Sequence, residues 1–413
     1  MLIEILTILA SVLVGYQAKQ NPWRAICLIV FLLPTYVIRF PLFGIPTNTV
    51  ELLLVGTLIG TLWPRERRRA YWQVIKKINS RIKIWAILFL ATALVSTLVS
   101  SQFRVSLGIL KGWIVAPLLL AGLVYGARSS ADQKRQLLYA LIASATTISC
   151  VALVMGKVEG RLQALYDTPN SLALYIAPVL AATFWQAETG RKNKGYLVMA
   201  AAIQVLALIG SQSVGAALAV IISLSIGTSL WLKKGKRQAL AVLCGATLVA
   251  IWLLWQSGKI PYLLQPLTNP AVHTSASVRQ QLWSVSWDLI KEHPLLGVGL
   301  GQFEPHYQVK LHERFARYSL NPTLYLQPPL SEFVFRDPHN WVFAFYLNLG
   351  LTGLASFIAL NVLVLKKTHH KQPSVHASYY VLLITYLLVG LVDTIYWKND
   401  LAALWWLTIA VLL

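Results

Sequence analysis

The chain has 413 residues, of which 56% are hydrophobic and only 12% are charged. Soluble domains carry about 25% charged residues, so the composition excludes an ordinary soluble globular protein and indicates a polytopic membrane protein. The net charge of +21 does not predict nucleic-acid binding, because the basic residues fall in short loops between apolar runs, as in the cytoplasmic loops of membrane proteins.

Apolar runs of about 17–25 residues recur along the chain and predict an all-α protein with twelve or thirteen transmembrane helices. The first run lacks a basic start and contains Glu4, so we expect a retained span or a membrane-dipping segment rather than a cleaved signal peptide. The predicted spans are 2–17, 24–39, 47–63, 84–101, 105–126, 136–155, 171–188, 196–211, 214–232, 238–256, 341–365, 377–395 and 400–413. They divide the chain into N-terminal transmembrane helices (1–256), one large periplasmic loop (257–340) and C-terminal transmembrane helices (341–413).

Lysine and arginine are unevenly distributed between the two sets of loops, which predicts the orientation of the chain. Six of them lie in the short loops of one set, and seven lie in the long insert. The other 23 of the 36 lie in 18–24, 64–83, 127–135, 190–195, 233–237 and 366–371. Under the positive-inside rule these last loops are cytoplasmic, so the insert faces a periplasm-like space.

The segment 64–85 mixes basic residues with Tyr71, Trp72 and Val74. This mixture suits an amphipathic helix that lies on an anionic cytoplasmic leaflet. An ordinary basic loop fits the same pattern, and neither interpretation is catalytic.

Within the long insert, apolar residues from Val278 to Leu289 recur at helical spacing and predict an amphipathic helix. This helix should end at His293-Pro294, which three glycines at alternate positions of 297–301 follow. No predicted strand precedes the glycines, so they indicate a tight turn returning to the membrane surface rather than a dinucleotide-binding loop.

Three basic side chains are candidates for chemistry. His339 lies at the start of a predicted span, where it could act as a general base, or could simply cap a helix or contact a lipid head group. Arg279 lies near the start of the insert helix and could clamp an oxyanion with its planar fork, although a solvated arginine fits too. Arg161 precedes another span and could add a second cation, the alternative being interfacial snorkelling.

Acidic residues are few. Asp393 and Glu51 lie within or at the edge of predicted spans, where ionisable groups are costly and often functional. No acidic pair or histidine set shows metal-ligand spacing, so we expect neither a metal nor a cofactor, and arginines would have to meet any phosphate charge. Trp283 and its aromatic neighbours fit a sugar-stacking platform or, more commonly, an interfacial belt.

Four stretches together resemble the O-antigen ligase and polymerase family of bacterial envelope glycan enzymes. In that family an arginine precedes Pro-Asn at a span start, Ser-Arg-Gly opens a later span, Arg and Trp precede His-Pro-x-x-Gly-x-Gly, and His-Asn precedes a Gly-x-x-Gly span. The corresponding stretches are GRLQALYDTPNSLALYIAPVL (160–180), GSQSVGAALAV (210–220), SASVRQQLWSVSWDLIKEHPLLGVGLGQF (275–303) and DPHNWVFAFYLNLGLTGLASF (337–357). Their order and the place of the long loop also match, and the resemblance covers roughly 150–413.

The resemblance implies an inverting, metal-independent transfer of a glycan from a polyprenyl-diphosphate donor to a lipid or glycan acceptor. It places the reaction on the outer face of the bacterial inner membrane. Carried over by position, His339 would be the base on the acceptor hydroxyl, and Arg279 and Arg161 would bind the diphosphate. The residues that would shape the substrate site are Asn170, Asn340 and Trp283. Diphosphate is a good leaving group, so charge clamping and orientation can supply most of the catalysis.

The chain departs from the family pattern at two places. Where the family shows Ser-Arg-Gly, this sequence has Ser213-Val214-Gly215, so a cation is missing. Either donor recognition differs or another outer cation substitutes, the candidates being Arg104, Lys111 and Lys157. The second departure is an extra span at the N-terminus.

Other functions fit parts of the same pattern. A ligase and a polymerase differ only in the acceptor, and the sequence does not separate them. A transporter of a small anion such as bicarbonate should show inverted halves with interrupted spans, and no such symmetry is evident, although Pro34 and Pro178 interrupt spans. A non-catalytic scaffold for envelope assembly would tolerate the loss of His339.

Overall fold

The computed structural model describes residues 2–42, 44–127, 129–189, 193–231, 275–320, 334–368 and 375–413. In this part of the chain nearly all regular structure is helical, and the strands form two short antiparallel hairpins. The prediction of an all-α polytopic membrane protein is therefore confirmed. The predicted span 238–256 lies outside the described residues.

The helices before the insert begin and end close to most of the predicted boundaries. They are α1 (Leu2–Gln20), α2 (Pro22–Phe31), η1 (Leu33–Val37), α3 (Thr49–Leu62), α4 (Arg65–Lys76), α5 (Ser80–Leu98), α6 (Phe103–Ile109), η2 (Leu110–Val115), α7 (Ala116–Gly126), α8 (Ala131–Met155), α9 (Pro169–Thr189), α10 (Lys194–Ser211) and α11 (Val214–Trp231). The hairpins pair β1 (Arg39–Leu42) with β2 (Ile45–Asn48) and β3 (Lys157–Val158) with β4 (Arg161–Leu162). The later helices are α14 (Ser275–Glu292), α15 (Phe303–Leu320), α16 (Trp341–Thr368), α17 (Val375–Val389) and α18 (Asn399–Leu412).

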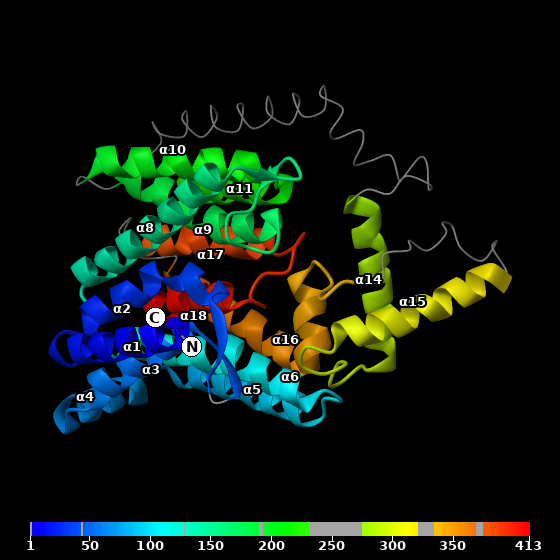
Figure 1. Ribbon diagram of the computed structural model, residues 1–413, viewed down its shortest axis with the longest axis horizontal. Coiled ribbons are helices and arrows are strands. Elements are labelled where there is room, and N and C mark those ends of the chain that lie inside the picture. Colours follow the sequence, from blue (N-terminus) through cyan, green and yellow to red (C-terminus); the bar gives the residue numbers. More distant parts are fainter. Residues whose placement is uncertain are drawn as a thin grey trace.

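Five helical segments of the described chain are long and apolar enough to cross a membrane: Ser80–Leu98, Phe103–Gly126, Ala131–Met155, Lys194–Ser211 and Trp341–Lys367. The apolar helices α2, α3, α11, α17 and α18 are shorter. Helices α9, α17 and α18 lie in the centre of the bundle, where α17 packs against α9 and α11, and α18 packs against α7 (Figure 1). Every residue of α18 from Asp400 to Leu412 is buried.

Two predicted spans are wrong at their C-terminal ends. In the span predicted at 24–39, α2 ends at Phe31, because Pro34 cannot donate a helical hydrogen bond, and the chain continues through η1 into β1. In the span predicted at 377–395, α17 ends at Val389, and residues 390–398 form a turn that leads into α18. Leu33 and Tyr36 at the first break, and Ile395, Tyr396 and Trp397 at the second, are buried in the bundle, so hydropathy alone continues through both breaks.

The helical interpretation of the basic segment 64–85 is confirmed. Helix α4 covers Arg65–Lys76, and α5 begins at Ser80. Tyr71 and Val74 are buried, and the ring of Tyr71 lies against Gly126 of α7, whereas Trp72 is exposed. Helix α4 lies at the end of the molecule opposite α14 and α15 (Figure 1).

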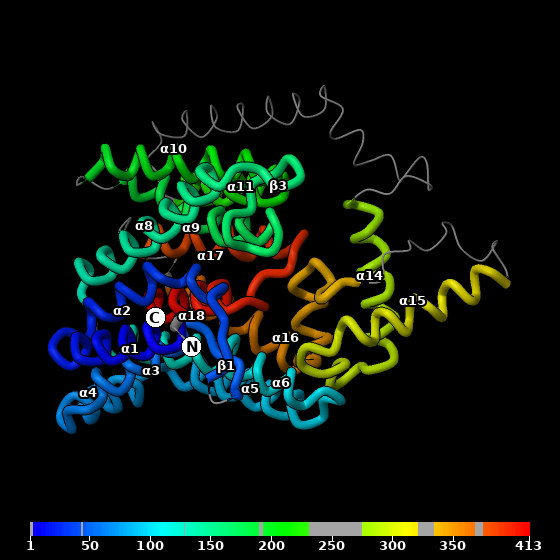
Figure 2. The backbone as a smooth tube through the Cα atoms, in the orientation of Figure 1, coloured from blue at the N-terminus to red at the C-terminus, as the bar shows by residue number. Residues whose placement is uncertain are grey.

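The turn after α14 docks into a break in α16. Gly350, with φ of 71° and ψ of −176°, interrupts α16, and the N–H of Leu351 donates to the carbonyl of Leu295 at 3.1 Å. The N–H of Val298 donates to the carbonyl of Leu347 at 2.8 Å. The predicted tight turn is thus present, and it fixes α14 relative to α16. Figure 2 shows the chain path through this region.

A second, smaller hydrophobic cluster joins α14 and α15 to α16. It contains Leu282, Val285, Leu289, Ile290, Phe303, Tyr307, Leu311 and Leu347. Because Leu347 belongs to α16, the described part of the long insert packs on the membrane-spanning part through apolar contacts as well as through the turn.

Candidate active site

The turn at 390–398 connects three parts of the chain through consecutive carbonyl groups. The carbonyl of Gly390 accepts from the N–H of Trp341 at 2.8 Å, and that of Leu391 accepts from Asn340 Nδ2 at 2.9 Å. The carbonyl of Val392 accepts from Arg279 Nε at 2.6 Å. The next residue, Asp393, is therefore held between the start of α16 and the start of α14.

The segment before α16 has a strained but well-supported backbone. His339 has φ of 49°, a left-handed conformation that L residues rarely adopt, although His tolerates it better than most. Its N–H donates to Asp337 Oδ1 at 3.0 Å, and Trp283 Nε1 donates to the carbonyl of Pro338 at 3.1 Å. Asn340 Oδ1 accepts from the N–H of Val342 at 2.8 Å and so caps α16. Strain maintained by this many contacts is typical of functional sites.

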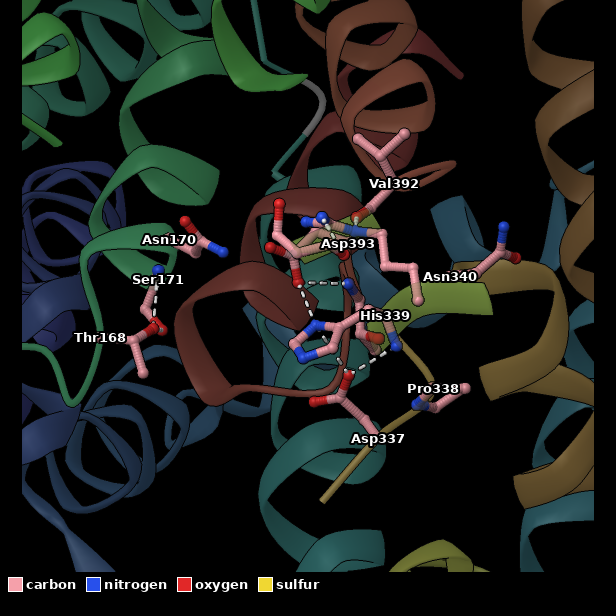
Figure 3. Close-up of polar contacts among 12 residues, drawn as sticks. Thr168, Asn170, Ser171, Asp337, Pro338, His339, Asn340, Val392 and Asp393 are labelled. Carbon is pink, nitrogen blue, oxygen red and sulfur yellow. Dashed lines mark hydrogen bonds and ion pairs between the residues drawn. The ribbon is translucent and has the colours of Figure 1, made fainter. Parts of the chain in front are cut away.

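The imidazole of His339 lies between two carboxyl groups (Figure 3). Its Nδ1 is 2.9 Å from Asp393 Oδ1, which also accepts from the N–H of Thr394 at 2.8 Å. Asp337 Oδ1 is 3.6 Å from the same nitrogen. Asp393 is buried and His339 is half-buried. An Nδ1–H that donates to Asp393 leaves Nε2 as the proton acceptor, an arrangement that suits a general base.

The two partners shift each other's protonation. Burial lowers the pKa of His339, but the hydrogen bond to Asp393 and the charges of Asp337 and Asp393 outweigh it, so the pKa lies above its usual value. Burial raises the pKa of Asp393, but the hydrogen bond and charge of His339 outweigh it, so this pKa lies below its usual value. Asp393 is therefore ionised when it orients the imidazole.

The charge of Arg279 reaches both members of this pair, since it lowers the pKa of His339 and that of Asp393. Its guanidinium is fixed by the carbonyl of Val392 and by that of Ser275, to which NH1 donates at 3.1 Å. Arg279 therefore lies within electrostatic reach of His339. This proximity arises from α14 and the 390–398 turn together.

Arg161 lies on β4, far in the sequence from Arg279 and His339. Its Nε donates to the carbonyl of Ser211 at 2.8 Å, and its NH2 donates to Asn170 Oδ1 at 2.8 Å. Burial lowers the pKa of Arg161, and the charge of Asp393 opposes that effect, so the guanidinium lies within electrostatic reach of Asp393. Asn170 is the second residue of α9, whose start Thr168 caps by accepting from the N–H of Ser171 at 3.2 Å.

The predicted site residues differ in what their side chains contact. Asn340 and Trp283 are predicted to contact substrate. In the structure their side chains donate hydrogen bonds to the carbonyls of Leu391 and Pro338. They therefore position the turn and the His339 segment. The sequence indicates Asp393 only as an acid within a predicted span and gives it no role beside His339. The predicted helix through 395 obscured that Asp393 lies in a turn.

The ligand atoms of Asp337, His339 and Asp393 all lie within 4.8 Å of one another, so a metal ion could be considered. The protein supplies two arginine charges to the same group, and His339 Nδ1 already faces Asp393 at hydrogen-bond distance. Positive neighbours disfavour a bound cation and favour an anion. The donor set therefore fits a hydrogen-bonded acid–base pair better than a metal centre.

Comparison with known proteins finds a family model that matches part of the chain. Residues 199–358 match the family model described as O-antigen ligase, a range that includes Arg279 and His339. None of the curated proteins compared with the chain matches it. The apolar helices and this match indicate a multi-pass membrane protein with a general role in membrane glycan transfer. Over residues 199–358 the chain is thus similar to the O-antigen ligase family.

Proposed function

We propose that the protein transfers a glycan from a polyprenyl-diphosphate carrier to an acceptor hydroxyl at the outer face of the bacterial inner membrane. The observation that carries this proposal is the His339–Asp393 pair, with Nδ1 and Oδ1 2.9 Å apart, within electrostatic reach of Arg279 and Arg161. A base beside two guanidinium groups is the combination that an acceptor hydroxyl and a diphosphate leaving group require.

In the proposed reaction, His339 Nε2 removes the proton of the acceptor hydroxyl, and the oxygen attacks the anomeric carbon of the donor sugar. The bond from this carbon to the diphosphate oxygen breaks, and polyprenyl diphosphate leaves with the electron pair. Asp393 stabilises the imidazolium formed at His339, as a buried carboxylate does for a general base. Because the attack is a single displacement, the configuration at the anomeric carbon inverts.

Arg279 and Arg161 take the charge that develops on the diphosphate. Two backbone carbonyls hold Arg279, so its orientation is set before substrate arrives. Such preorganised positive charge stabilises a transition state without reorganisation at the moment of reaction. The proposal assigns this role to arginines and requires no metal ion.

The test is reconstitution of the full chain in lipid with a polyprenyl-diphosphate glycan and two acceptors, a lipid core and a growing glycan chain. Transfer to the first identifies a ligase, and transfer to the second identifies a polymerase. His339→Ala should lower the turnover by about 10²–10⁴-fold, the usual contribution of a general base. His306→Ala is the matched control, because that histidine lies on α15 with Nδ1 2.8 Å from the carbonyl of Gln302. Equal turnover in His339→Ala and wild type would exclude the enzymatic proposal.

A further inference from the structure

The charges within the candidate site do not suffice for a diphosphate. Arg279 and Arg161 contribute two positive charges, and the carboxylates of Asp337 and Asp393 contribute two negative charges that act on the same imidazole. With neutral His339 this group has no net charge. A doubly esterified diphosphate brings one negative charge on each phosphate, and its leaving form gains another. An anion of this kind binds where positive charge is in excess, so another cation is needed.

Lys398 lies between the two parts of the chain that carry these charges. It is the last residue of the turn that carries Asp393, and its Nζ donates a hydrogen bond to Ser171 Oγ. Ser171 follows Asn170, the residue whose side chain holds Arg161. Lys398 therefore joins the two halves of the site, the 390–398 turn and the start of α9.

The ammonium group of Lys398 has no carboxylate at ion-pair distance among the described residues. The charge of Lys398 acts on Asp400, whose carboxyl oxygens accept hydrogen bonds from Tyr166 at 2.8 Å and from the N–H of Leu401 at 2.9 Å. The contact of Nζ is a neutral hydroxyl, which a phosphate oxygen can replace at a gain, because charge-assisted hydrogen bonds are stronger.

The three cations suggested by the sequence are placed less well. Lys111 forms an ion pair with Glu51 at 2.8 Å and also donates to the carbonyl of Pro46. Arg104 and Lys157 are exposed, on α6 and on the β3–β4 hairpin. Lys398 is half-buried beside the site residues.

We propose that Lys398 is a diphosphate-binding residue and that it supplies the positive charge missing at Val214. This inference rests on the proposed donor class. Val214 opens α11 between Ser211, whose carbonyl binds Arg161, and Gly215, whose Cα faces the side chain of Val392. Position 214 therefore lies beside the same site, and an arginine placed there is a direct test of charge replacement.

The experiment uses the full chain in lipid nanodiscs, with two measurements on each variant. One is the donor KM in the transfer assay, and the other is the affinity for sugar-free polyprenyl diphosphate. Lys398→Gln should weaken both by about ten- to 100-fold, the contribution of a charge-assisted hydrogen bond. Lys398→Arg should lose far less, and Val214→Arg in the Lys398→Gln background should recover most of the lost affinity. All variants are compared by thermal unfolding.

Ser171→Ala separates charge from structure. It removes the hydroxyl that Lys398 contacts but keeps the ammonium group, so donor affinity should stay within about twofold of wild type if charge is what matters. If Ser171→Ala and Lys398→Gln weaken binding equally, or if Lys398→Gln changes neither measurement, the role in diphosphate binding is refuted.

The outcomes also separate this inference from the proposed function. If polyprenyl diphosphate binds in a way that depends on Lys398 but no glycan is transferred to either acceptor, the role of Lys398 is supported and the proposed reaction is refuted. If glycan transfer does not depend on Lys398, the proposed reaction is supported and the diphosphate-binding role of Lys398 is refuted. Absence of both binding and transfer in wild type would overturn both.

Discussion

His339 and Asp393 are 54 residues apart in the sequence, yet His339 Nδ1 and Asp393 Oδ1 lie 2.9 Å apart. The contact joins the residue before α16 to the turn between α17 and α18. It gives the imidazole a fixed orientation and a charged partner, and both follow from the early end of α17 at Val389.

The first prediction concerns pH. Transfer requires neutral His339, so the rate should rise with pH through the pKa of this residue, which Asp393 and Asp337 hold above its usual value. Asp393→Asn removes the charge that stabilises the imidazolium, so the pKa falls and the rising limb moves to lower pH. The maximal rate should also fall, because the base is weaker and less well oriented. The measurement is kcat against pH.

Asp288→Asn is the control for that profile. Asp288 lies on α14, the helix that carries Arg279, but it pairs with Arg314 at 2.6 Å rather than with the site. Asp288→Asn should therefore leave the rising limb of the pH–rate profile at its wild-type position. If Asp393→Asn does not shift the rising limb of the pH–rate profile, the group that titrates in this profile is not His339.

The second prediction concerns Arg279. Arg279→Lys keeps the charge but loses the planar fork that binds the carbonyl of Val392 and presents further donors. The donor KM should rise by about ten- to 100-fold. Arg314→Lys is a matched control, because that arginine also makes two side-chain contacts, to Ser284 and Asp288, but within the α14–α15 pair. A donor KM that is unchanged in Arg279→Lys would argue against the diphosphate clamp.

The third prediction separates positioning from substrate contact at Asn340. Asn340→Ala removes the cap of α16 and the bond to Leu391, so stability should fall by about 1 kcal/mol or more, together with kcat. Asn340→Asp keeps the capping oxygen but loses the donor, so it should recover stability without recovering kcat.

Asn21→Ala provides the comparison for this residue. Asn21 caps α2 by accepting from the N–H of Arg24 at 3.2 Å, so its loss should cost similar stability with no change in kcat. If instead Asn340 variants alter acceptor KM alone, direct substrate contact is the better description.

The fourth prediction concerns the break in α16. Gly350 has φ of 71°, and a Cβ there would collide with the carbonyl of Leu295. Gly350→Ala should therefore cost about 1–2 kcal/mol from backbone strain alone and more from displacement of the turn, seen as a lower unfolding temperature. Gly122→Ala in α7 is the control, since nothing lies within 4 Å of its added Cβ. It should be neutral or stabilising by up to about 1 kcal/mol, and a loss equal to that of Gly350→Ala would contradict the account of the break.

The fifth prediction concerns metal ions. Asp337, His339 and Asp393 could offer three ligand atoms, but two guanidinium charges act on the same group. Dialysis against a chelator should leave the transfer rate within about twofold, because basic side chains rather than a metal ion meet the diphosphate charge. Loss of transfer that a divalent ion restores would assign the cluster to a metal instead.

The sequence alone determines the class of this protein and much of its helical layout. Long apolar runs need no tertiary context to predict membrane helices, because the bilayer requires each segment to satisfy its own backbone hydrogen bonds. Local signals also located Arg279 on its helix and His339 beside the start of α16. The family resemblance also singles out Arg279 and His339 from the sequence alone.

Only the tertiary structure determines which of these side chains contact one another. Hydropathy extends α2 and α17 beyond their observed ends, because most apolar residues at the breaks are buried in the bundle and have the hydropathy of a continuing helix. The contacts of His339 with Asp393, of Arg279 with Val392 and of Lys398 with Ser171 join segments far apart in the chain. No periodicity or local motif records such contacts, since packing of α14, α16 and α18 around one turn creates them. Sequence therefore identified candidate side chains, and the packing of the helices determined which of them lie together.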